Sequence, residues 1–261
     1  GADVSRQASD ATSVASCATS GGGAPREALI FVCSPTQQSL HLPHAKDEAI
    51  DVANEVTARI RRGGSPTDLK QELLDGHGAY KYFLFSGHGD VRLPPVRSAS
   101  SEEAAKDASE AREASRTVTL GFTNTATGQL ELTLPTTLAA MLASHGLQLV
   151  FLNGCDTASL GAQLRQRGVP HVVCWRTKAA DAASRTLARA FFAALAKGRS
   201  VGEAYGDATQ SVLAMATRRG VPLFMFCDPD ADGEDAKTSP PYAAGVPVLL
   251  TVEGDDKSYI H

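Results

Sequence analysis

The stretch Leu147-Gln-Leu-Val-Phe-Leu152, followed by Asn153-Gly-Cys-Asp-Thr157, decides the fold class. An earlier stretch, Tyr80-Lys-Tyr-Phe-Leu-Phe-Ser86, has the same form and is broken at once by Gly87-His-Gly89. Short apolar runs that end against turn residues are typical of strands buried on both faces of a parallel sheet. The carboxyl ends of such strands form a crevice where ligands bind. We therefore expect the residues after both runs to meet in one crevice.

Strand-like and helix-like segments alternate along most of the chain. Further strands are expected at Ala28–Cys33, His171–Trp175, Val221–Phe226 and Val246–Val252, with a hairpin formed by Thr117–Thr123 and Gly128–Thr133. Helices are expected at Ala45–Ile60, Pro66–Leu74, Pro135–His145, Thr157–Arg167, Asp181–Ala196 and Val201–Met215. This alternation favours an α/β fold with a mainly parallel central sheet covered by helices on both faces.

The chain reads as one folded domain with two irregular segments. Residues 1–25 are rich in Ala, Ser, Thr and Gly without apolar periodicity, which indicates a disordered leader or linker. Residues 26–261 carry the α/β pattern and show no second core. Within them, residues 91–116 mix basic and acidic side chains without an apolar face, so we expect a mobile charged insertion on the surface.

Composition excludes several classes of protein. The formal net charge of −4 and the pI near 6.0 argue against a nucleic-acid partner, which would leave a basic footprint. We find neither an apolar run of membrane-spanning length nor a secretory signal, so no membrane is expected. The five cysteines are an odd number and favour reduced thiols in the cytoplasm over a disulfide framework. They are Cys17, Cys33, Cys155, Cys174 and Cys227.

His88 and Cys155 are the candidate catalytic residues, because a histidine and a cysteine at two strand ends can form a base and its nucleophile. A thiol attacks as thiolate, and the dipole of the helix expected after Cys155 should lower its pKa. Gly154 allows close approach of a substrate. Acyl transfer also needs donors to its oxyanion, for which we choose the N–H groups of Gly89 and Cys155.

Each candidate also has an ordinary structural interpretation. Cysteine is among the most frequently buried residues, and Cys33, Cys174 and Cys227 are interpreted as buried thiols. Glycine-flanked histidines occur in common turns. The case for chemistry therefore depends on His88 and Cys155 together.

Two motifs carry a family resemblance. Phe85-Ser-Gly-His-Gly89 and Leu152-Asn-Gly-Cys-Asp-Thr157 resemble the signature motifs of CHAT-domain peptidases, which are caspase-like cysteine proteases. Their clan also contains caspases, metacaspases, separase and gingipains. The order of histidine before cysteine matches that clan, and the similarity extends from about Ala28 to Phe226. It implies a caspase-like sandwich in which His88 activates Cys155 without a third catalytic carboxylate, a cofactor or a metal. Asp90 and Asp156 are then turn or surface residues.

The resemblance also suggests residues that bind substrate. Asp181 corresponds to an acidic residue that, in related clan members, helps to bind a basic P1 side chain, the residue before the cleaved bond. The alternative is that Asp181 caps the helix that follows. Asn153, which directly precedes the Gly154-Cys155 pair, and Trp175, which ends the strand expected at His171–Trp175, complete the candidate substrate-binding set. Arg176-Thr-Lys178 departs from the commoner family pattern and brings two basic side chains near Asp181.

The sequence thus predicts a cysteine endopeptidase that acts on a protein or peptide substrate. Cleavage after Arg or Lys and self-processing within residues 91–116 are further hypotheses. A non-catalytic CHAT-type interaction module is the alternative, and a sensor or regulatory domain is a candidate partner. A nucleotide-binding domain is disfavoured, because Cys33-Ser-Pro-Thr36 provides no glycine-rich phosphate loop.

An acidic stretch resembles the opening of a calcium loop. Asp228, Asp230, Asp232 and Gly233 follow the D-x-D-x-D-G pattern, but Ser239 stands where an EF-hand requires glutamate. We interpret this stretch as a solvated turn and expect no metal site.

Overall fold

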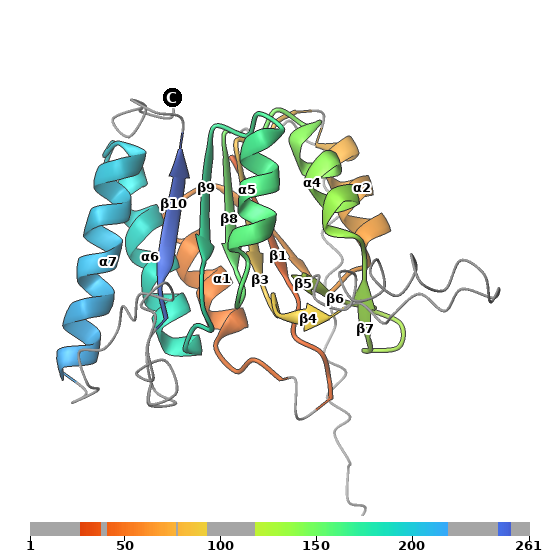
Figure 1. Cartoon of the computed structure of the whole chain (residues 1–261), viewed down its shortest axis with the longest axis horizontal. Helices are drawn as coiled ribbons and strands as arrows, with labels where there is room; N and C mark the ends of the chain where they lie inside the picture. Colours follow the sequence, from red (N-terminus) through yellow and green to blue (C-terminus); the bar gives the residue numbers. More distant parts are fainter. Residues whose placement is uncertain (1–26, 38–40, 77, 93–117, 219–244, 252–261) are drawn as a thin grey trace, which may run out of the picture.

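A six-stranded sheet forms the centre of the computed structural model, which describes residues 27–37, 41–76, 78–92, 118–218 and 245–251 (Figure 1). The strands lie in the order β10-β9-β8-β3-β1-β2. Their bounds are β1 Ala28–Val32, β2 Ala58–Arg62, β3 Tyr82–Ser86, β8 Leu149–Asn153, β9 His171–Trp175 and β10 Pro247–Thr251. All neighbouring pairs are parallel except β9 and β10. The predicted mainly parallel sheet is confirmed.

Helices cover both faces of the sheet, as predicted (Figure 1). On one face lie α1 (Ala45–Ala53), α6 (Asp181–Ala196) and α7 (Val201–Arg218). On the other lie α2 (Pro66–Asp75), α4 (Pro135–Ala143) and α5 (Ala158–Gln166). Alternate residues of each strand face opposite helical layers, so every residue of β1, β3, β8 and β9 is buried.

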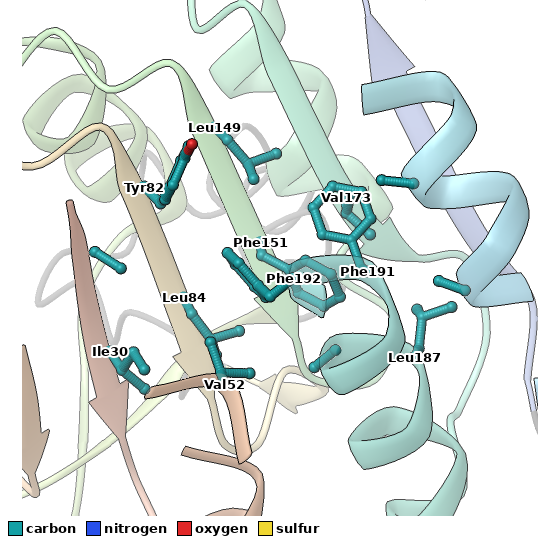
Figure 2. Packing of buried hydrophobic residues seen from close by; sticks show 14 of the residues in the cluster. Ile30, Val52, Tyr82, Leu84, Leu149, Phe151, Val173, Leu187, Phe191 and Phe192 are labelled. Atoms are coloured by element: carbon teal, nitrogen blue, oxygen red, sulfur yellow. The ribbon is translucent and has the colours of Figure 1, made fainter. Parts of the chain in front are cut away.

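The core beneath α6 is built around aromatic rings (Figure 2). Phe151 of β8 packs against Phe191 and Phe192 of α6, with ring centroids 5.4 and 5.7 Å apart. Such contacts add to the hydrophobic gain of burying the rings. They fix α6, and therefore its first residue Asp181, relative to the strand that leads to Cys155.

The predicted helix Ala45–Ile60 is too long. α1 ends at Ala53, and Ile60 lies in β2, a strand that the sequence analysis missed. β2 pairs in parallel with β1, and this pairing overrides the helical spacing that continues through Val56. The Arg59 and Arg61 side chains on the edge strand are held by carboxylates of α2.

Two small sheets flank the carboxyl edge of the main sheet. β6 (Gly121–Thr123) and β7 (Leu130–Leu132) form the predicted hairpin. β5 (Val118–Thr119) pairs instead with β4 (Val91–Arg92), so the expected insertion begins with two paired residues rather than a loop. The N–H of Gly121 donates to the carbonyl oxygen of His88 at 2.8 Å, which ties the hairpin to the histidine turn.

Ser65 and Ser200 cap the helices α2 and α7. Each hydroxyl accepts an N–H from the residue three positions on, and that residue's carboxylate accepts the N–H of the serine in return. Among the described helices, none is both long and apolar enough to span a bilayer.

Several sequence predictions fall outside the described residues. They concern the leader, most of the charged insertion, the strand at Val221–Phe226, the acidic stretch from Asp228 to Gly233, and the cysteines Cys17 and Cys227.

Candidate active site

The histidine and cysteine motifs follow adjacent strands in matching register. Ser86, the last residue of β3, is the Cα partner of Asn153, the last residue of β8. His88 lies two residues after Ser86, and Cys155 lies two residues after Asn153. Because the strands are parallel neighbours, the turns that carry these side chains leave the sheet side by side at its carboxyl edge.

The two turns approach each other backbone to backbone. A Cβ on Gly154 would lie 2.7 Å from the carbonyl oxygen of Gly87 and 2.9 Å from the nitrogen of Gly89. A Cβ on Gly89 would collide with the carbonyl oxygen of Cys155. Only glycine permits this distance, so the glycines bring the histidine and cysteine turns together.

Thr157 fixes the turn that carries the cysteine. Its buried hydroxyl donates to the carbonyl oxygen of Gly154 at 3.0 Å and accepts the N–H of Trp175 at 3.1 Å. Asp156, the residue before Thr157, has a φ of 51°, which is the one positive φ of a non-glycine residue among the described residues. Aspartate tolerates this left-handed conformation better than most residues, which allows the sharp exit from β8 toward α5.

His88 and Cys155 line the same cavity, which has a volume of ≈ 50 Å³. Both are half-buried, as is Asp181, whereas the other polar lining residues, Glu48, Ser86, Asn153 and Ser184, are buried. The remaining lining residues are Leu42, Glu48, Ser86, Gly87, Asn153, Gly154, Ala179, Asp181 and Ser184. The sequence-predicted pair thus opens onto a narrow polar pocket formed by β3, β8, α1 and α6.

The Cys155 thiol does not have the lowered pKa that the sequence suggested. Burial raises its pKa, and the negative charges of Asp90 and Asp156 raise it further. The N–H of Ala179, which donates to Sγ at 3.4 Å, and the charge of Lys178 act in the opposite direction but are outweighed. α5 begins at Ala158, three residues after the cysteine, so Cys155 lies outside the first turn of that helix. The thiol is therefore neutral at rest and needs a base.

Of the two residues chosen for the oxyanion, Cys155 lines this cavity, whereas Gly89 lies behind it against the cysteine turn. Within the described ranges, neither the Gly89 nor the Cys155 N–H donates a backbone hydrogen bond. The next N–H along the chain differs, because that of Asp156 donates to the carbonyl oxygen of Thr177 at 3.2 Å. The Asp156 N–H is therefore committed to the fold.

Asp181 lies in the cavity lining as the first residue of α6. Its Oδ2 accepts the N–H of His44 at 3.1 Å, which joins α6 to the start of α1. The alternative that Asp181 caps its own helix is wrong, since the N-cap is Ala180 and makes no side-chain hydrogen bond. The nearby Lys178 lies 3.9 Å from Asp90 and is largely exposed.

Asn153 and Trp175 have different positions. Asn153 lines the cavity, whereas Trp175 is completely buried and has no surface for direct contact with a substrate. The indole Nε1–H of Trp175 donates to Asn153 Oδ1 at 2.7 Å, so Trp175 orients the asparagine from beneath. Asn153 Nδ2 in turn donates to Glu48 Oε2 at 2.6 Å.

Glu48 is the cavity residue that the sequence analysis missed. It is 1% exposed and lies on the face of α1 that also buries Ala45, Ala49 and Val52. The sequence did contain a signal, because Glu48 lies at helical spacing among the apolar residues of one helix face. A glutamate in such a position is rarely buried without a partner. Burial raises the pKa of Glu48 to about 7, and the like charge of Asp181 contributes to the increase.

The other described cysteines have structural positions. Cys33 and Cys174 are completely buried, as predicted, and burial raises the pKa of each to about 12. Such thiols are inert as nucleophiles. In the described part of the chain, His, Cys, Asp and Glu side chains form no group of three able to hold a metal.

Comparison with known proteins identifies the family. The CHAT domain family model matches residues 3–242, which is most of the chain. The chain therefore belongs to the CHAT domain family. A search of the curated proteins gave no match.

Similarity to solved structures is weak. The pyridoxal kinase from Staphylococcus aureus in complex with pyridoxal is 14% identical over 73% of this chain and 87% of its own, with a TM-score of 0.33. Pyridoxal kinase from Trypanosoma brucei is 13% identical over 76% of this chain and 91% of its own, with a TM-score of 0.34. At these values the likeness carries no argument about function.

Proposed function

We propose that this CHAT-family chain is a cysteine endopeptidase with a His88–Cys155 dyad. The observation that carries the proposal is that both side chains line one cavity, at the ends of adjacent strands in matching register. The N–H groups of Gly89 and Cys155, which make no backbone hydrogen bond within the described ranges, supply the donors that acyl transfer requires. The substrate is a protein or peptide.

The reaction begins with transfer of the Cys155 thiol proton to the His88 imidazole. The sulfur then forms a bond to the peptide carbonyl carbon, and the Gly89 and Cys155 N–H groups stabilise the oxyanion. The C–N bond breaks as His88 returns the proton to the leaving amine. Water, deprotonated by His88, then attacks the thioester, releases the acid product and restores the thiol.

The raised pKa of Cys155 makes His88 essential to this scheme. A neutral thiol in a partly buried, acidic environment is a poor nucleophile until a base removes its proton. Asp90 and Asp156 favour the neutral thiol and have no catalytic role in the scheme.

An active-site probe tests the proposal. A peptidyl acyloxymethyl ketone with P1 arginine should label the wild type once and leave Cys155→Ala unlabelled by intact mass. His88→Ala should slow labelling by about 100-fold or more. Cys174→Ala, which removes a buried thiol, is the matched control and should label normally. Equal labelling rates for His88→Ala and the wild type would contradict the dyad.

Self-processing is part of the same proposal. Four arginines, Arg92, Arg97, Arg112 and Arg116, lie in the charged segment between the two motifs. Incubation of the purified wild type should yield fragments ending at one of them, whereas Cys155→Ala should keep its intact mass. Identical intact masses for both proteins would remove self-processing without affecting the dyad.

A non-catalytic interaction module is the second candidate, and the raised pKa of Cys155 is the observation that favours it. In that case the probe leaves the wild type unlabelled and peptides remain uncleaved. The same experiment therefore separates the two functions.

A further inference from the structure

We propose that a cavity between α1, α6 and α7 is a second binding site, which takes a small molecule or a side chain that carries a carboxylate group. The cavity has a volume of ≈ 230 Å³, against ≈ 50 Å³ for the cavity at Cys155. The three helices that surround it cover one face of the sheet (Figure 1). This inference goes beyond the proposed peptidase function and does not depend on it.

α6 supplies most of the lining through one of its faces. Ala182, Arg185, Thr186 and Arg189 follow one another at three- and four-residue steps, which places them on one side of the helix. Met215 of α7 lines the cavity next to Thr186, whose hydroxyl lies 3.4 Å from its sulfur. The cavity therefore combines a short apolar side, made by Ala182 and Met215, with two guanidinium groups.

The charges of the lining favour an anion. Arg185 donates from Nε to Asp51 at 2.7 Å and from Nη1 to Asp47 at 3.2 Å, which leaves its Nη2 without a partner in the described part of the chain. Arg189 is exposed and makes no hydrogen bond or ion pair within the described ranges. Two arginines against the single carboxylate of Asp51 leave one positive charge of the lining uncompensated.

A carboxylate fits this arrangement better than other charged groups. A planar guanidinium binds a carboxylate through two parallel, charge-assisted hydrogen bonds. A cationic ligand would meet the like charges of both Arg185 and Arg189, and the carboxylate of Asp51 that could attract it already accepts from Arg185.

The volume limits the size of the ligand. Sites for drug-sized molecules measure roughly 300–1,000 Å³, so ≈ 230 Å³ suits a smaller group. A carboxylate on a short apolar chain would contact the arginines with one end and the apolar side with the other. Small carboxylic acids and the glutamate side chain both have this form.

The cavity adjoins the candidate active site. Asp181 lines the cavity at Cys155, and the next residue, Ala182, lines this one. His44 also lines it, and the backbone N–H of His44 donates to Asp181 Oδ2 at 3.1 Å. A glutamate of a polypeptide bound at Cys155 is therefore one source of the carboxylate, and a free small acid is the other.

A titration followed by amide chemical shifts tests the site without catalysis. Pentanoate should bind about fivefold or more tightly than its neutral isostere pentanamide, with shifts at Ala182, Thr186 and Met215. Arg189→Gln should remove this difference, because the unpaired guanidinium is lost. Arg167→Gln is the matched control, since it removes the same charge from an exposed position at the end of α5, on the other face of the sheet.

Three results of the titration would overturn the inference. They are equal binding of pentanoate and pentanamide, a preference for pentanoate that persists in Arg189→Gln, and shifts confined to residues outside the cavity. Because Arg189 is exposed, its replacement should leave the fold intact, and the spectrum of the unliganded variant checks this directly.

A second experiment identifies the source of the carboxylate. Peptides that differ by glutamate or glutamine at single positions outside P1 are cleaved by the wild type and by Arg189→Gln. A preference for glutamate at one position that is lost in Arg189→Gln assigns the cavity to the substrate. If pentanoate binding depends on Arg189 but no peptide position prefers glutamate, the ligand is a free small acid. Absence of cleavage would count against the peptidase proposal alone, since the titration does not require it.

Discussion

Glu48 and Glu72 are both buried glutamates on helices that cover the sheet, but their surroundings differ. The Glu72 carboxylate on α2 receives Arg59 at 2.8 Å and Arg61 at 3.2 Å from the edge strand β2. The Glu48 carboxylate on α1 accepts the neutral amide of Asn153, and its Oε1 has no hydrogen-bond partner among the described residues.

The difference separates a structural charge from a candidate functional one. A buried charge that serves the fold is matched by opposite charges in the same fold, because an unpaired ion in the interior is costly. Glu72 follows this rule at the edge of the sheet. Glu48 does not follow this rule. It lines the candidate active site, and the hydrogen-bond donor to its Oε2 is a neutral amide rather than a cation.

The largest expected effect is the pH dependence of stability due to Glu48. Its pKa rises from 4.5 to about 7 on folding, so the folded chain holds this proton more tightly than the unfolded chain. The free energy of unfolding should therefore fall as the pH rises through this interval, by roughly 3 kcal/mol in total. Below pH 4.5 the carboxyl is protonated in both states, so the free energy of unfolding stays at its higher value and no longer changes with pH through this group.

Urea unfolding of the wild type and Glu48→Gln at pH 5, 6, 7 and 8 measures this effect. The stability of Glu48→Gln relative to the wild type should increase over this range, since glutamine does not ionise. A constant difference at all four pH values would mean that Glu48 has an ordinary carboxylate environment, and the contrast with Glu72 would be lost.

The second effect concerns Glu72. Glu72→Gln should lower the free energy of unfolding by about 2 kcal/mol, since Arg59 and Arg61 lose their charged partner. The loss is below that of a fully buried pair because the arginine side chains are 39% and 34% exposed. Urea unfolding measures it. Probe labelling of Cys155 should be unaffected, and a slowed reaction would show that the two regions are coupled.

The third prediction concerns Thr157, which lies in the turn beside the candidate active site. Thr157→Val keeps the side-chain shape but removes the hydroxyl between Gly154 and Trp175. Stability should fall by about 1.5 kcal/mol, because the buried N–H of Trp175 loses its acceptor. Unlike Glu72→Gln, this change should also slow labelling of Cys155. Thermal unfolding and the labelling rate, measured on one sample, test both parts.

The smallest effect is expected at the start of α2. Ser65→Ala removes the hydroxyl that accepts the Asp68 N–H at 3.1 Å and should cost about 1 kcal/mol. The helix that carries Glu72 would be weakened without a change at the cavity. Calorimetry gives the stability change, and a change in P1 preference would contradict the separation of the two regions.

Local patterns predicted most of the fold. The apolar runs that became β1, β3, β8 and β9 are unbroken because both faces of these strands are covered. The caps at Ser65 and Ser200 are equally local, because capping depends on residues three positions apart. β2 was missed because its placement depends on pairing with β1, which overrides a helical spacing.

Part of the candidate site was also predictable from local patterns. His88 and Cys155 were found because each directly follows a strand run, and the structure places both in one cavity. The direction of the Cys155 pKa shift was not predictable, because it depends first on how far packing buries the thiol and then on the charge of Asp90 from a separate turn. The burial of Trp175 likewise depends on how the helices pack over β9.

The amino-acid sequence by itself determined strands β1, β3, β8 and β9, the turns that end β3 and β8, and the two reactive residues, because each depends on neighbours within a few positions. Only the tertiary structure decided that Glu48, Asn153 and Asp181 share a cavity with the cysteine. Charges and hydrogen bonds act through distance in space, and that distance is fixed by the packing of α1 and α6 against the sheet.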